Sequence, residues 1–69
     1  MPYYVINRNK DEHNKNELHQ TTCSWKPEVA NQVNLGYHST NKDALDYAKS
    51  IGWNNADGCY HCCPDIHHG

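Results

Sequence analysis

His19-Gln20-Thr21-Thr22-Cys23 and Cys59-Tyr60-His61-Cys62 are the two stretches of sequence that decide the fold. A C-x2-C pair offers two thiolates from one tight turn, and an H-x3-C pair adds an imidazole and a third thiolate. His19, Cys23, Cys59 and Cys62 therefore predict a tetrahedral Cys3His site for Zn²⁺. A shell of four protein ligands leaves no open position on the metal, so the predicted site is structural.

Three other residues are alternatives to His19 as the fourth ligand, namely His61, Cys63 and His67. Cys63 has two interpretations, a small buried residue or a reactive thiol that exchanges with a ligand. His61, His67 and His68 can also form a second metal site, although separate solvated histidines are the simpler interpretation.

The chain of 69 residues forms one domain, residues 1–69. With 36% hydrophobic residues and a mean hydropathy of -1.05, its core is thin. In chains this short, apolar burial barely offsets the entropy of ordering, so a metal site or disulfides must add stability. Residues 1–8 lack the pattern of a secretory signal, and we therefore expect a cytoplasmic protein with reduced thiols. This expectation favours Zn²⁺ over the alternatives of disulfides and free thiols.

Charge and hydropathy indicate which classes of partner the protein is unsuited to bind. The formal net charge is -2, the pI is about 6.3, and the six Lys and Arg residues form no run. A nucleic-acid-binding domain usually has a basic stripe and a high pI, so charge disfavours a nucleic-acid partner. The sequence also has no apolar stretch near the roughly 20 residues of a membrane-spanning helix, and we expect no membrane partner.

Residue patterns predict an α+β fold, in which a three-stranded antiparallel sheet packs against one main helix and a C-terminal zinc knuckle. The strands are expected at about 3–7, 17–20 and 32–38, with Val33, Leu35 and Tyr37 on one face of the third. A polar turn is expected at 7–16 and a loop at 53–58. The tail after Cys63 can add one helical turn.

The helix, expected over 41–51, has the strongest local signals. Residues 39–41 offer N-cap side chains, and Asp43 in the first turn suits the helix dipole. Gly52 is expected to end the helix as a left-handed C-cap. The apolar stripe at helical spacing consists of Ala44, Leu45, Ala48 and Ile51.

The order of these features resembles the metal-binding domain at the N-terminus of the Ada DNA methylphosphotriester repair protein, and similar cysteine modules of some bacterial nucleases. That family has a C or H-x3-C pair, a strand, a helix containing Ala, a turn with Gly and an aromatic residue, and a C-x2-C pair. The resemblance covers about residues 18–62. The stretch Ala-Asp-Gly-Cys-Tyr-His-Cys-Cys (56–63) is also similar to small uncharacterised bacterial proteins with a GCYYC-type motif.

The resemblance implies a zinc-binding fold, with His19 and Cys23 as the first pair and Cys59 and Cys62 as the second. In the repair family the thiolate at the leading position of the first pair accepts the methyl group, and here that position is His19. Basic residues for DNA phosphates are scarce as well. We therefore expect no enzyme activity and no catalytic residue.

The predicted function is a stand-alone structural-zinc interaction module that binds a protein partner. The alternatives are an Ada-like nucleic-acid-binding module without methyl transfer, and a metal- or redox-responsive sensor. Exposed Tyr and Trp side chains can anchor a protein partner or stack on bases. In so small a domain we nevertheless expect most of the aromatic residues in the core; they include Tyr3, Tyr4, Trp25, Tyr37, Trp53 and Tyr60.

Overall fold

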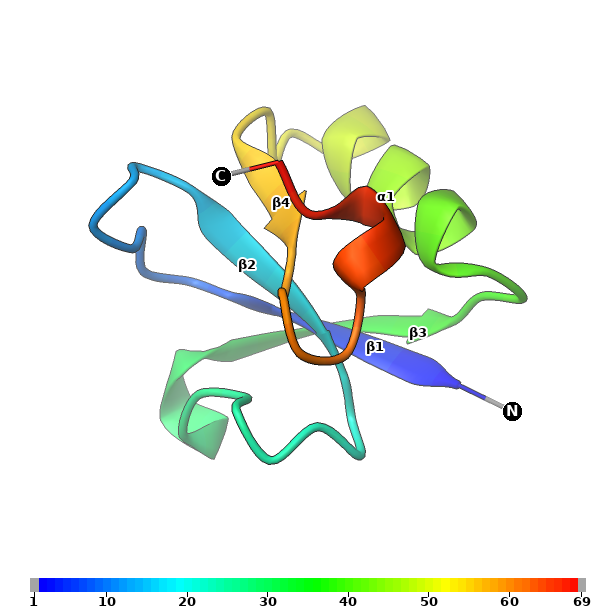
Figure 1. Ribbon diagram of the computed structural model, residues 1–69, viewed down its shortest axis with the longest axis horizontal. Helices are drawn as coiled ribbons and strands as arrows, with labels where there is room; N and C mark the ends of the chain where they lie inside the picture. Colours follow the sequence, from blue (N-terminus) through cyan, green and yellow to red (C-terminus); the bar gives the residue numbers. More distant parts are fainter. Residues whose placement is uncertain (1, 69) are drawn as a thin grey trace.

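The computed structural model describes residues 2–68. Its elements, in chain order, are β1 (Tyr3–Asn7), β2 (Asn16–Gln20), the 3-10 turn η1 (Val29–Asn31), β3 (Gln32–Tyr37), α1 (Asn41–Ser50), β4 (Ala56–Gly58) and the 3-10 turn η2 (Pro64–Ile66). The strands form one sheet in the order β3-β1-β2-β4. α1 and η2 lie on one side of this sheet, and the segment 21–31 lies on the other (Figure 1).

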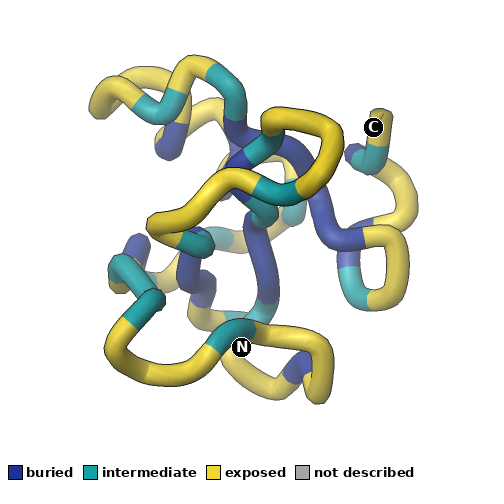
Figure 2. The backbone as a smooth tube through the Cα atoms, turned by 90° about the vertical axis from the view of Figure 1, so that its left-hand side faces the viewer, coloured by how far each residue is buried: buried dark blue, intermediate teal, exposed yellow. Residues whose placement is uncertain are grey.

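The core lies between the sheet and α1, because the strand side chains that face the helix are apolar. Figure 2 shows buried backbone in the interior of the molecule and exposed backbone in most of the connecting segments. The buried cluster joins β1, β2 and β3 to α1 and the C-terminal segment; it consists of Tyr4, Ile6, Leu18, Leu35, Ala44, Leu45, Ala48, Ala56, Cys63 and Ile66. The α+β class and the single main helix predicted from the sequence are confirmed.

The structure adds a fourth strand to the three antiparallel strands expected from the sequence. β1 pairs antiparallel with β2 and with β3, whereas β4 pairs parallel with β2. The segment 53–58, expected to be a loop, therefore contains β4 at its end. Ala-Asp-Gly has little intrinsic strand preference, so this strand forms through its pairing with β2 and not through local propensity.

A β-bulge in β3 changes the face that one predicted residue occupies. Tyr4 lies opposite Gly36 and Val5 opposite Asn34, so Leu35 is an extra residue in the ladder. Tyr37 consequently lies opposite exposed Tyr3, their rings in an edge-to-face contact at 5.9 Å. The prediction that Tyr37 shares a face with the buried Leu35 is wrong for this reason.

The predicted signals at both ends of α1 are confirmed. Thr40 is the N-cap, and its side chain accepts a hydrogen bond of 3.0 Å from the Asp43 amide. At the other end Gly52 has a φ of 111°, and the amide of Trp53 donates to the carbonyl of Ala48 at 3.0 Å. This closes the helix with the hydrogen bond of a Schellman motif, and α1 ends at Ser50, one residue earlier than expected.

Asn41 connects the start of α1 to the sheet and to the C-terminal segment. Its Oδ1 accepts hydrogen bonds from the Tyr4 hydroxyl at 2.5 Å and from Gln20 Nε2 at 3.0 Å. Its Nδ2 donates to the Asp65 carboxylate at 2.8 Å. One side chain thus fixes β1, β2 and η2 around the helix N-terminus, close to the segment that contains the cysteines.

Candidate metal centre

The parallel pairing of β2 with β4 brings the two ligand pairs together although they are far apart in sequence. Leu18 lies opposite Gly58, and the amide of Cys59 donates to the Leu18 carbonyl at 2.9 Å. Neighbouring parallel strands end at the same edge of a sheet. His19 near the end of β2 and Cys59 just after β4 therefore lie side by side.

Turn hydrogen bonds position the remaining two cysteines. After β2, the amide of Cys23 donates to the carbonyl of Gln20 at 3.0 Å. After β4, the amide of Cys63 donates to the carbonyl of Cys59 at 2.8 Å, which curls residues 59–63 into a knuckle. Two amides also face sulfur: that of His61 lies 3.4 Å from Cys59 Sγ, and that of Gln20 lies 3.4 Å from Cys62 Sγ. Such N–H···S contacts stabilise negative charge on the sulfur.

The four predicted ligands come together as one compact group. The donor atoms of His19, Cys23, Cys59 and Cys62 all lie within 4.8 Å of one another. The sulfurs of Cys23 and Cys59 are 4.0 Å apart. A zinc–sulfur bond of about 2.3 Å places two sulfurs of a tetrahedral site about 3.8 Å apart. The spacing of this group therefore fits a zinc ion with little movement of the side chains.

The environment of His19 supports the same interpretation. The residue is 1% exposed, and its Nδ1 is a buried nitrogen without a hydrogen-bond partner. A buried polar atom without a partner is costly, and a metal ion would remove that cost. Burial, with a smaller effect of Lys26, lowers the pKa of the imidazole, so the ring favours the neutral form that binds metals.

Glu17 is a residue of the site that was not predicted from the sequence. It lies two positions before His19 on β2, and its carboxylate Oε1 is 3.4 Å from His19 Nε2. Side chains two apart on a strand share a face, so alternation was the available signal. A carboxylate behind a ligating histidine fixes the ring orientation and the tautomer. Here it would leave Nδ1 as the nitrogen available to the metal.

None of the three alternatives to His19 belongs to the compact group of possible ligands. Cys63 is fully buried in the core, with its sulfur 3.6 Å from Cys62 Sγ. His61 stacks on Trp25, and Nδ1 of His67 lies 2.9 Å from the Gly58 carbonyl. Within residues 2–68, the group formed by the four predicted ligands is the one cluster with metal-site spacing, and it does not include the C-terminal histidines.

Burial also shapes the chemistry of the cysteines. It raises the pKa of the Cys62 thiol, and it raises the pKa of the Cys63 thiol to about 11. Without a metal, both groups are therefore thiols near neutral pH. Metal binding requires the thiolate form of a ligand and releases its proton, which makes the affinity of such a site dependent on pH.

The aromatic side chains are more exposed than the sequence predicted. Tyr4 is fully buried and Trp53 packs against the core, as predicted. The expectation of a mostly internal set is wrong for the other residues, because they lie on the outer face of the sheet or in the ligand-bearing turns. The exposed members of the set are Tyr3, Trp25, Tyr37 and Tyr60.

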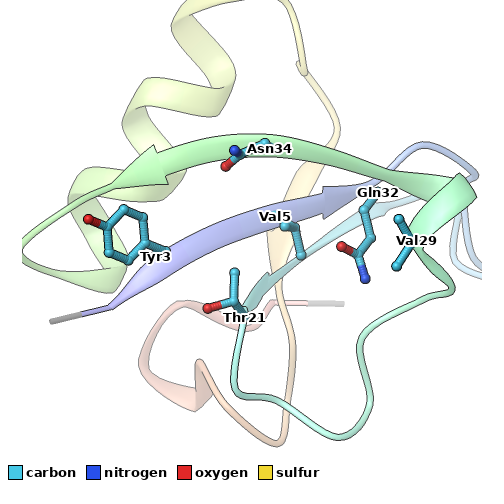
Figure 3. Close-up of a pocket in the computed structure, with 6 residues that line it drawn as sticks. All are labelled: Tyr3, Val5, Thr21, Val29, Gln32 and Asn34. Atoms are coloured by element: carbon cyan, nitrogen blue, oxygen red, sulfur yellow. The ribbon is translucent and has the colours of Figure 1, made fainter.

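A pocket of about 470 Å³ lies on the sheet face opposite α1. Its walls come from β1, β3, η1 and the turn after β2 (Figure 3). The residues that line it are Tyr3, Val5, Thr21, Val29, Gln32 and Asn34. None of them belongs to the ligand group, so this pocket is separate from the candidate metal centre.

Two further findings concern membrane spans and known proteins. No helix in the described part of the chain has the length and apolar character needed to cross a membrane. The resemblance to the Ada-type domain stays a prediction from sequence. In comparisons with known proteins, no family model, no curated protein and no solved structure matches this chain.

Proposed function

We propose that this protein is a structural-zinc module that binds a protein partner and has no enzymatic function. The ligands would be His19, Cys23, Cys59 and Cys62, whose donor atoms lie within 4.8 Å of one another. Four protein ligands fill the tetrahedral shell of zinc, which leaves no position for a catalytic water. The bound ion would supply stability, since it ties the turn after β2 to the knuckle after β4.

One observation carries the interaction role: each ligand-bearing turn contributes an exposed ring, Trp25 from one and His61 from the other, and these two rings contact each other. Trp25 follows Cys23 by two residues, and His61 lies between Cys59 and Cys62. The rings of Trp25 and His61 stack with centroids 4.2 Å apart and an angle of 9°. A metal that holds the two turns together would therefore also hold this surface together. Exposed Trp and Tyr side chains are the usual anchors of protein interfaces.

Affinity capture with matched variants tests this function. Zinc-loaded wild-type protein, Trp25→Ala and Tyr37→Ala would be used to capture proteins from cells that express the chain. Tyr37 is the control, because it is an exposed aromatic residue on β3, away from the ligand-bearing turns. We expect a partner that binds wild type and Tyr37→Ala but not Trp25→Ala, and that then binds in purified form. Partners that do not distinguish the variants would contradict the proposal.

A redox-responsive sensor is the second candidate, and the distance of 4.0 Å between the sulfurs of Cys23 and Cys59 favours it. Peroxide would oxidise these two thiols to a disulfide with release of two waters, and the site would lose two ligands. The test is zinc release measured with a chromogenic chelator during titration with peroxide. The sensor role requires zinc release together with a Cys23–Cys59 disulfide found by mass spectrometry; zinc that stays bound under peroxide would exclude it.

A further inference from the structure

A surface of four rings lies over the knuckle; we call it the knuckle surface and define it as Trp25, Tyr60, His61 and His67. Trp25 is 63% exposed and Tyr60 is 65% exposed. Tyr60 contacts the rings of His61 and His67 edge to face, each at 5.5 Å. With the Trp25–His61 stack, these contacts form one continuous surface of rings, contributed by the turn after β2, the knuckle and the residue that follows η2.

The charges behind this surface are mainly negative. The carboxylate of Asp57 is 3.8 Å from His67 Nδ1. The carboxylate of Glu17, 3.4 Å from His19 Nε2, is a second acidic group beside the ligand-bearing turns. Lys26 is a cation beside the surface, and its ammonium donates to the Cys23 carbonyl at 3.4 Å.

A filled metal site would add to the negative potential. Three thiolates contribute a charge of -3 and a zinc ion contributes +2, so a Cys3His centre carries a net charge of -1. The chain already has a formal net charge of -2 with neutral thiols. The faces of Trp and Tyr rings are themselves electron-rich and attract cations. Charge complementarity therefore selects a cationic ligand for this surface and disfavours a polyanion.

We propose that the knuckle surface binds an arginine-bearing segment of the protein partner, with a guanidinium stacked on Trp25 or Tyr60. Arginine fits better than lysine, because its planar and weakly hydrated guanidinium stacks on aromatic faces while its N–H groups stay free to donate hydrogen bonds. This inference rests on the proposed function and names the chemistry of its partner.

Peptide selection on zinc-loaded protein tests this inference. A displayed library of random short peptides would be selected on wild type, and the enriched peptides resynthesised with arginine, lysine or citrulline at each selected arginine. Citrulline is the matched control, because it has nearly the shape of arginine without its charge. Binding would be measured by calorimetry and by Trp25 fluorescence. We expect the selected peptides to be rich in arginine. Replacement of a selected arginine by citrulline should lower the affinity by about tenfold or more.

Protein variants locate the site of binding. Trp25→Ala and Tyr60→Ala should each weaken the selected peptide by about tenfold, while Tyr37→Ala should not change it. Zinc content and the far-ultraviolet circular dichroism of each variant show whether it has kept its fold. Trp25 and Tyr60 are both largely exposed, so we expect both variants to fold. If one of them does not fold, the other still tests the inference.

The possible outcomes separate this inference from the proposed function. Peptides that depend on Trp25 but contain no excess of arginine would overturn the inference and leave a protein-binding module. If no peptide depended on Trp25 or Tyr60, both would fail. Tighter binding of a single-stranded oligonucleotide, in competition with the peptide, would overturn both in favour of a nucleic-acid partner.

Discussion

Glu17 lies beside the metal ligands without belonging to them, and its role rests on one contact. Its carboxylate is 3.4 Å from His19 Nε2, while Nδ1 of the same ring has no hydrogen-bond partner. The contact with Glu17 therefore engages one ring nitrogen and leaves the other free to bind a metal ion. The x3 spacing between His19 and Cys23 predicted the ligand, but spacing alone does not give the orientation of the ring, so the function of Glu17 could not be predicted.

Replacement of Glu17 should weaken metal binding without removing a ligand. We expect Glu17→Ala to lower zinc affinity by about tenfold to a hundredfold, because the imidazole loses its fixed orientation. Glu17→Gln keeps an oxygen acceptor and should lose less. Competition with a chromogenic chelator measures both affinities. Glu12→Ala is the control, because the Glu12 side chain is 88% exposed and its contact is with His13. Equal affinities in all four proteins would show that Glu17 does not position His19.

Cys62 and Cys63 are neighbours in sequence, and their environments predict different results on substitution. Cys62→Ser should abolish stoichiometric zinc binding, because it removes a predicted ligand. Cys63→Ala should keep one equivalent of zinc and cost about 1 kcal/mol, since only a small core group is lost. Cys63→Ser should be less stable than Cys63→Ala, because it buries a hydroxyl in a site that is fully enclosed. Metal analysis and urea unfolding of each variant measure these effects. Loss of zinc from Cys63→Ala with retention by Cys62→Ser would reverse the assignment.

At the scale of elements, local signals in the sequence predicted α1 and missed β4. The Thr40 cap, the apolar stripe and Gly52 all act within a few residues of the helix, so each could be recognised in the sequence. β4 has three residues, and its pairing with β2 depends on a contact between segments about 40 residues apart. The bulge at Leu35 likewise comes from strand pairing, and alternation in the sequence pointed to the wrong face for Tyr37.

Gly58 is the position of β4 at which a side chain has no room. A Cβ there would overlap the Ile66 side chain and would lie 2.8 Å from the Cys63 carbonyl oxygen. We expect Gly58→Ala to destabilise the protein by about 1–3 kcal/mol or more and to weaken zinc binding, because Cys59 follows directly. Urea unfolding and chelator competition measure the two effects. Ile66→Ala added to Gly58→Ala should restore only part of the stability, since the contact with backbone oxygen remains. Wild-type stability of Gly58→Ala would mean that this close approach does not constrain the strand.

At the scale of the whole molecule, the fold would be stabilised by a core on one face of the sheet together with a metal centre. The apolar cluster lies between α1 and the sheet, whereas the sheet face opposite α1 is open enough to form a pocket. The centre joins the end of β2 to the segment after β4, at the edge of that core. Composition predicted that the core would be thin and would need additional stabilisation, because a chain of 69 residues with 36% hydrophobic residues buries little apolar area.

Removal of the metal should therefore unfold the whole chain. We expect the purified protein to contain about one equivalent of zinc, and a strong chelator to abolish cooperative unfolding and the circular dichroism of α1. The two tryptophans separate global from local effects, since Trp25 stacks over the knuckle and Trp53 packs against the core. In Trp25→Phe, Trp53 is the one remaining tryptophan, so its fluorescence reports on the core alone. On chelation, the emission maximum of Trp53 should shift to the wavelength of a solvent-exposed indole. A chelated protein that keeps its helix and the Trp53 signal would mean that the centre orders only the knuckle, and that the core is sufficient for the fold.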